Sequence, residues 1–128
     1  MATTSVRYIV DDVDAAIDFY AEQFGFEVVT HPAPAFAMLS GRGLRLLLSA
    51  PGGQGGGGQI LPDGHRPEPG GWNRIQFEVA NLPAEVERLR AAGAHFRSDI
   101  VHGRGGDQVL VEDPSGNPIE LFQPHRDS

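Results

Sequence analysis

The sequence lacks cysteine, has no block of basic residues and contains no long apolar run. Without cysteine, disulfide bonds, thiolate metal ligands and cysteine nucleophiles are excluded. The 128 residues include 10 Lys and Arg against 17 Asp and Glu, and the resulting formal net charge of −7 disfavours binding to a nucleic-acid backbone. Apolar runs are far shorter than the roughly 20 residues of a membrane span, and residues 1–5 do not resemble a signal peptide. We therefore expect a cytoplasmic protein with no nucleic-acid or membrane partner.

Glycine and proline are abundant, and they concentrate in one window. The chain has 17 Gly and 10 Pro, many of them in residues 51–71, PGGQGGGGQILPDGHRPEPGG. Only Ile60 and Leu61 carry aliphatic side chains there, so the window is not expected to form a core element. A connection of about 20 residues inside a compact domain is usually either a linker or a functional flap. The sequence leaves both interpretations open.

Before this window, the residue pattern predicts a strand, a helix and three more strands. Residues 6–10 form a short β-branched and aromatic run, which is typical of a strand. Asp12 is placed to cap a helix whose apolar residues recur at helical spacing up to Gly25. Further strands are predicted at residues 26–30, 36–39 and 44–49.

After the window, the same order recurs. Residues 74–79 predict a strand, and Asn81 begins a helix that has Pro83 in its first turn and ends at Gly93. Three more strands are predicted at residues 96–101, 108–111 and 119–122. We therefore expect an α+β fold of two βαβββ modules, residues 5–50 and 72–124, joined by residues 51–71 within one domain of residues 1–128.

The two modules also align residue by residue. Residues 6–16 (VRYIVDDVDAA) align without gaps on residues 75–85 (IQFEVANLPAE), which indicates an internal duplication. A second alignment, of LSGRGLRLLL on PSGNPIELF, matches Ser40 with Ser115 and predicts that Arg45 occupies the position of Glu120.

Two motifs carry a resemblance to a known family. VDDVDAAIDFYAEQFGFEV near the start and VEDPSGNPIELFQP near the end resemble the vicinal oxygen chelate superfamily, which includes glyoxalase I, extradiol dioxygenases, and the fosfomycin and bleomycin resistance proteins. The resemblance covers nearly the whole chain. It implies two βαβββ modules whose strands curl into a cupped, mixed β-sheet around a ligand cleft, with the helices outside and usually a homodimer. It is specific for the fold and says little about the activity.

The resemblance also implies positions for a metal site. Active members hold a divalent cation with four side chains, often two His and two Glu, from the first and last strands of each module. Here the resemblance places Ser5, Arg45, Arg74 and Glu120 at those positions. Arginine stays protonated and has no lone pair to donate, so this set would repel Mg²⁺, Zn²⁺ or Fe²⁺. We expect the usual metal site to be absent and no cofactor to be bound.

Strand alternation predicts which side chains face the cleft. Ser5 and Arg7 lie on that face of the first module, and Arg74 and Gln76 lie on it in the second. Arg74 and Glu120 belong to strands that we expect to be neighbours. They form either a buried salt bridge or an anchor for a polar ligand group, with Arg74 as donor and Glu120 as acceptor or base.

Two aromatic residues complete the candidate site. Trp72 is the only tryptophan, and three roles stay open for it: stacking on a planar ligand, attaching the loop to the sheet, or lying in a subunit interface. Phe36 is a weaker candidate of the same kind. The predicted ligand-binding residues are Ser5, Arg7, Phe36, Arg45, Trp72, Arg74, Gln76 and Glu120.

Five histidines offer a second route to a metal site. A site rebuilt from them with Glu112 or Glu120 requires a loop, the tail and a helix end to converge, so exposed or capping histidines are the favoured interpretation. His31 and His102 both follow strand ends and are the best candidates for proximity to the cleft.

Two functions remain open. The first is a metal-independent binding protein that sequesters a small aromatic or drug-like ligand, which the acidic charge and Trp72 favour. The second is an enzyme, a lyase, isomerase or dioxygenase, that uses a rebuilt divalent-metal site or acid–base catalysis by Glu120 and Arg74. A homodimer is expected in either case, because small modules bury little apolar surface and open sheet edges favour pairing.

Overall fold

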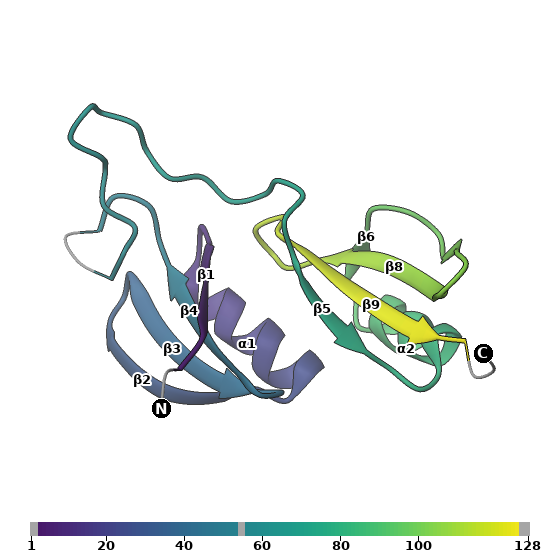
Figure 1. Ribbon diagram of the computed structural model, residues 1–128. Helices are drawn as coiled ribbons and strands as arrows, with labels where there is room; N and C mark the ends of the chain where they lie inside the picture. The colour runs from purple at the N-terminus through teal and green to yellow at the C-terminus, as the bar shows by residue number, and fades with distance from the viewer. Residues whose placement is uncertain (1–2, 54–55, 126–128) are drawn as a thin grey trace. The chain divides into compact units, whose positions relative to one another are not determined.

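The computed structural model describes residues 3–53 and 56–125. The chain divides into two compact units, Met1–Gly70 and Gly71–Ser128. Each unit holds one helix and one mixed sheet (Figure 1), which confirms the predicted α+β fold of two βαβββ-like modules. In the part of the chain that is described, neither helix is long and apolar enough to cross a membrane.

The first unit contains a four-stranded sheet with one helix against it. Its elements are β1 (Ser5–Ile9), α1 (Val13–Phe24), β2 (Glu27–Ala33), β3 (Phe36–Gly41) and β4 (Leu44–Ser49). The strand order is β1-β4-β3-β2, with β1 parallel to β4 and the other pairs antiparallel. Leu39, Leu46 and Leu48 are fully buried between this sheet and α1, where Tyr20 is also fully buried. The opposite face of the sheet is therefore the one that α1 does not cover.

The second unit has the order β5-β9-β8-β6, and β7 also pairs with β8. Its elements are β5 (Ile75–Glu78), α2 (Leu82–Ala91), β6 (His95–Phe96), β7 (Val101–His102), β8 (Gly106–Glu112) and β9 (Pro118–Pro124). The strand predicted at residues 96–101 is wrong, because bends at residues 97–99 separate β6 from β7. Ser98 and Asp99 are turn-forming residues, and the Ser98 hydroxyl donates to the Asp99 carbonyl at 2.9 Å.

The helix caps show the internal repeat most directly. Asp12 and Asn81 precede α1 and α2 with similar extended backbones, and each side chain accepts from the backbone N–H three residues on, at 3.1 Å in both cases. Such a cap satisfies one of the free N–H groups of the first helical turn. Helix α1 ends at Gly25, whose φ of 75° is in the left-handed region that glycine adopts without strain.

Strand register corrects the second repeat alignment. Tyr8 pairs with Leu48 on β4, and its repeat partner Phe77 pairs with Leu121 on β9. By the same count Leu47, and not Arg45, occupies the position of Glu120. The alignment of Ser40 with Ser115 is wrong because the two residues lie in different elements. Ser40 lies within β3, whereas Ser115 lies in the longer turn between β8 and β9.

That longer turn is closed by a buried carboxylate. Asp113 is only 4% exposed, and its Oδ1 accepts from the backbone N–H groups of Ser115 and Asn117 at 2.9 and 3.0 Å. Its Oδ2 accepts from the Asn117 side-chain amide at 3.0 Å. The turn thereby fixes where β9 begins, and so which β9 residue lies beside each residue of β8.

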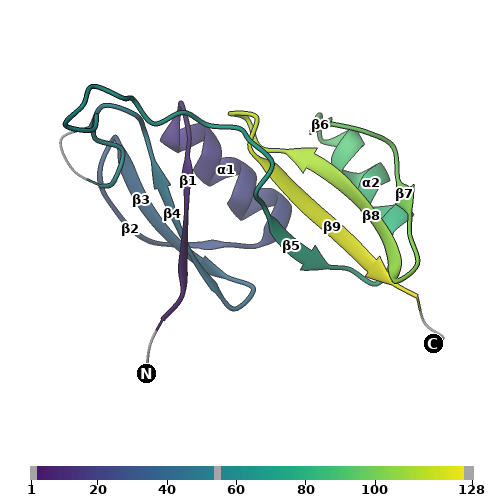
Figure 2. The ribbon, with the colours of Figure 1, turned by 45° about the horizontal axis from the view of Figure 1, so that its top comes forward.

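The glycine-rich connection packs against the first unit near its start. The described part of residues 51–71 has several turns and bends but no helix or strand, and the segment after β4 turns back beside the ends of β3 and β4 (Figure 2). Gly56 lies against the Phe36 side chain, Gly57 against the Arg7 guanidinium, and Gly58 against the Ala50 carbonyl. A Cβ atom at any of these glycines would collide with its neighbour. Glycine is thus needed there for close approach as well as for chain flexibility.

We expect Gly58→Ala to lower the free energy of unfolding by about 1 to 3 kcal/mol, because the new methyl group meets the Ala50 backbone carbonyl. Gly105→Ala is the matched control, since a Cβ there meets nothing within 4 Å and the residue is not in the left-handed region. Urea unfolding followed by circular dichroism measures both. Equal effects of the two substitutions would contradict the close packing of this segment.

Candidate functional site

The centre of the candidate site is the carboxylate of Glu120 on β9. Its side chain is only 9% exposed, and it receives hydrogen bonds from the neighbouring strand β5. The Arg74 guanidinium donates to Oε1 through Nε at 3.0 Å and through Nη2 at 2.8 Å. Gln76, the register partner of Glu120, donates to Oε2 at 2.6 Å. The predicted contact between Arg74 and Glu120 is therefore present as a salt bridge.

Gln108 on β8 completes the set of donors around Glu120. With its amide nitrogen facing the carboxylate, Gln108 donates to Oε2 at 3.0 Å and to Oε1 at 3.2 Å. Each carboxylate oxygen then accepts from at least two N–H groups, so the lone pairs of the ionised group are occupied. A buried charge held in this way is compensated by its partners and does not need a metal ion.

Arg97 is a site residue that the sequence analysis missed. Its Nε donates to Glu112 at 2.7 Å, Nη1 to the Gly71 carbonyl at 2.8 Å and Nη2 to the Gly116 carbonyl at 3.0 Å. The guanidinium also lies 4.7 Å from the centre of the Trp72 ring. The available signal was an arginine inside a predicted strand, but the sequence alone does not indicate its partners.

Trp72 lies next to this arginine and is 69% exposed. Arg97 contacts its ring, while Arg74 donates from Nη1 to its backbone carbonyl at 3.2 Å. The ring thus lies against an arginine that is itself bonded to Glu112 of β8, and all three roles left open by the sequence stay predictions. The exposed part of the ring is still available for stacking.

The candidates of the first unit form a separate group. Ser5 and Arg45 are register partners on β1 and β4, so their side chains share one face of the sheet. Arg7 donates from Nε to Ser49 Oγ at 3.2 Å and lies beside Gly57, and the Phe36 side chain lies beside Gly56. The chain itself therefore covers part of Arg7 and Phe36.

These residues do not fit a divalent cation. Register leaves Ser5, Leu47, Arg74 and Glu120 at the positions that the family uses for metal ligands, and the only carboxylate among them is already saturated. Leucine and arginine have no lone pair to offer. Among residues 3–53 and 56–125, no group of three His, Cys, Asp or Glu side chains is placed to hold a metal ion.

The histidines are dispersed, each beside a single polar partner. His31 on β2 lies 3.7 Å from Asp14, and His102 on β7 lies 3.0 Å from Asp107. The other pairs are His65 with Asp63 at 2.9 Å, His95 with Glu112 at 3.8 Å and His125 with the Gly103 carbonyl at 2.8 Å. The backbone N–H of His65, and then its side chain, hold the pKa of Asp63 below its usual value, but that residue lies in the connection between the modules.

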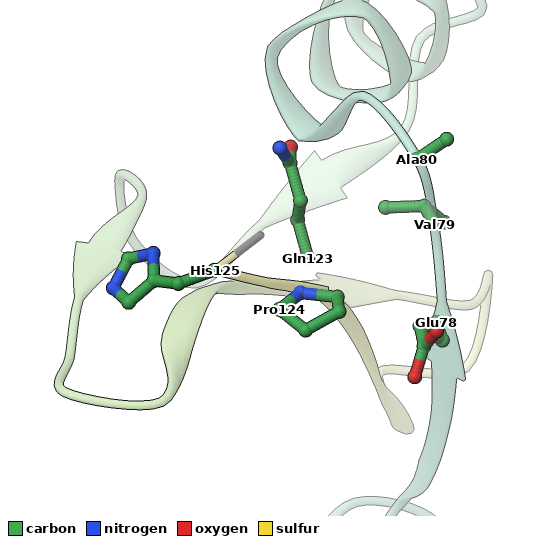
Figure 3. A pocket seen from close by; sticks show the side chains of 6 residues that line it. All are labelled: Glu78, Val79, Ala80, Gln123, Pro124 and His125. Carbon is green, nitrogen blue, oxygen red and sulfur yellow. The ribbon is translucent and has the colours of Figure 1, made fainter. Parts of the chain in front are cut away.

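A hollow of about 310 Å³ lies at the end of β5, but its polar groups do not converge. The Gln123 side chain extends toward α2, while Glu78 and His125 point in different directions (Figure 3). Gln123 Oε1 accepts from the Leu82 N–H at 2.7 Å, and His125 is bonded to Gly103 at 2.8 Å. This hollow lacks the arrangement expected of a specific site.

Comparison with known proteins agrees with the fold and defines the class. Residues 3–121 match the Glyoxalase/Bleomycin resistance protein/Dioxygenase superfamily, and the chain belongs to that family. This is the family that the sequence motifs resemble. No protein of curated function matches the chain.

Solved structures with the same fold include proteins of different stated roles. TnmS3, described as an antibiotic binding protein from Streptomyces sp. CB03234, is 24% identical with a TM-score of 0.71 over 98% of this chain and 97% of its own. A lactoylglutathione lyase from Agrobacterium tumefaciens is 23% identical with a TM-score of 0.73, over 95% and 92%. TioX from Micromonospora sp. ML1 is 20% identical with a TM-score of 0.73, over 98% and 100%. At these identities the likeness shows the fold alone.

We expect Glu120→Ala to reduce the free energy of unfolding by about 2 to 4 kcal/mol, because it leaves Arg74, Gln76 and Gln108 without their shared acceptor. Glu85→Ala is the control. It removes a salt bridge to Arg88 of similar length, 2.9 Å, on the exposed surface of α2, and should cost within about 1 kcal/mol. Chemical denaturation measures the free energy of unfolding of both variants. An equal loss of stability in the two would contradict the buried network.

Proposed function

We propose that this chain is a metal-independent binding member of its superfamily, which holds a small organic ligand, aromatic or drug-like. Its contacts would be Trp72, Arg74 and Gln76 in the second unit. Glu120 would position Arg74 and Gln76 and would act neither as a metal ligand nor as a base.

The saturated carboxylate of Glu120 is the observation that carries this proposal. A metal ligand needs a free lone pair, and a general base needs an unoccupied oxygen within reach of the proton that it removes. Arg74, Gln76 and Gln108 already donate to both Glu120 oxygens. Using this carboxylate for catalysis would first require these buried hydrogen bonds to break.

The character of the ligand follows from Trp72 and from the charge of the protein. An indole that is 69% exposed offers a flat apolar surface, and a formal net charge of −7 raises the local concentration of cationic compounds. The similarity to TnmS3, whose description states antibiotic binding, supports this class of ligand. Ser5, Arg7, Phe36 and Arg45 of the first unit remain proposed ligand contacts.

Isothermal titration calorimetry tests the proposal with two probes, bleomycin and the planar aromatic cation 9-aminoacridine. We expect saturable binding of at least one probe. Trp72→Leu should weaken it about tenfold, as stacking contacts contribute on the order of 1 kcal/mol or more. Val101→Ala, which trims another exposed apolar side chain of the second unit, should leave the affinity unchanged.

Elemental analysis after incubation with Ni²⁺, Zn²⁺, Mn²⁺ and Fe²⁺ distinguishes the enzymatic alternative. Close to one ion per chain, lost in Glu120→Ala and accompanied by turnover of lactoylglutathione, would overturn the proposal in favour of a metalloenzyme. Ligand binding without stoichiometric metal would support it.

We also propose that two copies of the chain associate, with β2 at the interface. All seven residues of this edge strand are exposed, and they include Val28 at 47% and Val29 at 59%. An exposed edge with apolar side chains favours pairing with a second strand.

Light scattering over a range of concentrations should give twice the chain mass of 13.7 kDa. Val29→Lys should shift the protein toward the monomer, because it places a charge on the edge. A monomer at every concentration, or an unaltered dimer in Val29→Lys, would contradict this interface.

A further inference from the structure

A second hollow, of about 420 Å³, lies in the first unit around Arg45. Its lining comes from the residues before β1, from β3, and from the turn into β4. The lining residues are Thr3, Thr4, Ser40, Gly43, Leu44 and Arg45. Every oxygen-bearing side chain of this lining is a hydroxyl, and no carboxylate is among them. The lining therefore combines one guanidinium with several neutral hydrogen-bonding groups.

Strand register places a hydroxyl group on each side of Arg45. Ser5 on β1 and Ser40 on β3 are both register partners of Arg45, so the three side chains form one row across the sheet. Leu46, the next residue, is fully buried toward α1. Since side chains alternate along a strand, this row lies on the face opposite the helix.

Arg45 is also unpaired among the described residues. Most of the other arginines are engaged: Arg7 with Ser49, Arg42 with the Phe24 carbonyl, and Arg74, Arg88, Arg90 and Arg97 with carboxylates. Arg45 has no hydrogen bond, ion pair or ring contact within the described part of the chain. The nearest acidic residue along its row, Glu27, lies beyond Ser40 on the second strand over, about 10 Å away at the usual strand spacing.

Among the described arginines, two others are without such contacts, and neither has a comparable setting. Arg66 borders a hollow of about 360 Å³, but Asp11 and Glu68 line the same hollow and would repel an anion. Arg104 lies in the turn before β8 and borders none of these hollows. Of the three unpaired arginines in residues 3–53 and 56–125, Arg45 is the one that lines a hollow with hydroxyl groups and no carboxylate.

We propose that this hollow binds the oxyanion group of a small organic molecule: a carboxylate, sulfate or phosphate. The guanidinium would donate in a bidentate manner to the oxyanion, and the hydroxyls of Ser5 and Ser40 would supply further donors. The apolar body of the molecule would lie over Leu47 and Met38, the half-buried register partners of the next row on the same face. The organic nature of the ligand rests on the proposed function, but the oxyanion site is testable without it.

Titrations followed by two-dimensional ¹H–¹⁵N NMR suit a weak site in a chain of 13.7 kDa. The probes are inorganic phosphate, benzoate and, as the neutral counterpart of benzoate, benzyl alcohol, each at constant ionic strength. We expect phosphate and benzoate to shift the amide signals of Gly43 to Arg45 saturably. Benzoate should bind more tightly than phosphate because it also covers apolar surface.

Arg45→Gln should weaken benzoate binding about tenfold or more, because hydrogen bonds to a charged group are the strong ones. Arg104→Gln removes the same charge away from the hollow and should change the affinity by less than about twofold, the effect of net charge alone. Both arginines are exposed, so we expect each variant to fold normally. Unchanged dispersion of the other amide signals in the spectrum would show this.

The outcomes separate this inference from the function proposed above. Binding of both anions that is lost in Arg45→Gln and kept in Arg104→Gln supports the site. The site is overturned if neither anion binds, if benzyl alcohol binds as well as benzoate, or if both arginine variants behave alike. Binding of 9-aminoacridine or bleomycin with no oxyanion binding would refute the Arg45 site and leave the proposed function intact.

Discussion

Burial of the Glu120 carboxylate is the constraint on which the arrangement of the second unit depends. A charge placed where its side chain is only 9% exposed is tolerated only when every lone pair finds a donor. The donors are Gln76 of β5, Arg74 immediately before that strand, and Gln108 of β8, so satisfying Glu120 also aligns β9 with the two strands that flank it. The Asp113 turn fixes the same alignment from the other end of the hairpin. A shift of β9 by one residue against β8 would break the hydrogen bonds to Glu120 and those to Asp113 together.

The internal repeat is retained in the backbone and has diverged in chemistry. Asp12 and Asn81 cap their helices in the same way, and Tyr8 and Phe77 pack at equivalent places in their sheets. The polar faces differ. Glu120 is surrounded by donors in the second unit, whereas its counterpart in the first is Leu47, with the unpaired Arg45 two residues before it. The two units therefore offer a ligand different chemistry, an exposed indole beside a neutralised ion pair in one and a free cation in the other.

Local patterns in the sequence predicted most of the fold. Helix caps, glycines at helix ends and the spacing of apolar residues are signals carried by residues close together in the sequence. These signals located both helices and most strands correctly. The contact between Arg74 and Glu120 was also predictable, because it needs only adjacent strands and alternation. The prediction that Arg45 occupies the position of Glu120 was wrong. The Ser-Gly motif on which it rested lies in a strand in one unit and in a turn in the other, and the sequence does not show how long that turn is. The partners of Arg97 and the packing of Gly56 to Gly58 were not predicted, because they depend on segments that meet only in the folded chain.

The boundary between the two units, at Gly70 and Gly71, limits which amino acids the chain can use there. Each unit closes its own sheet and caps its own helix, and the boundary falls between two glycines with φ of 106° and 86°, conformations that few other residues adopt. A Cβ atom at either glycine would meet nothing within 4 Å, so it is the backbone conformation, and not close packing, that favours glycine there. Replacing either one by an L-residue would therefore strain the link between the two units, although no neighbouring atom stands in the way of the new side chain's first carbon.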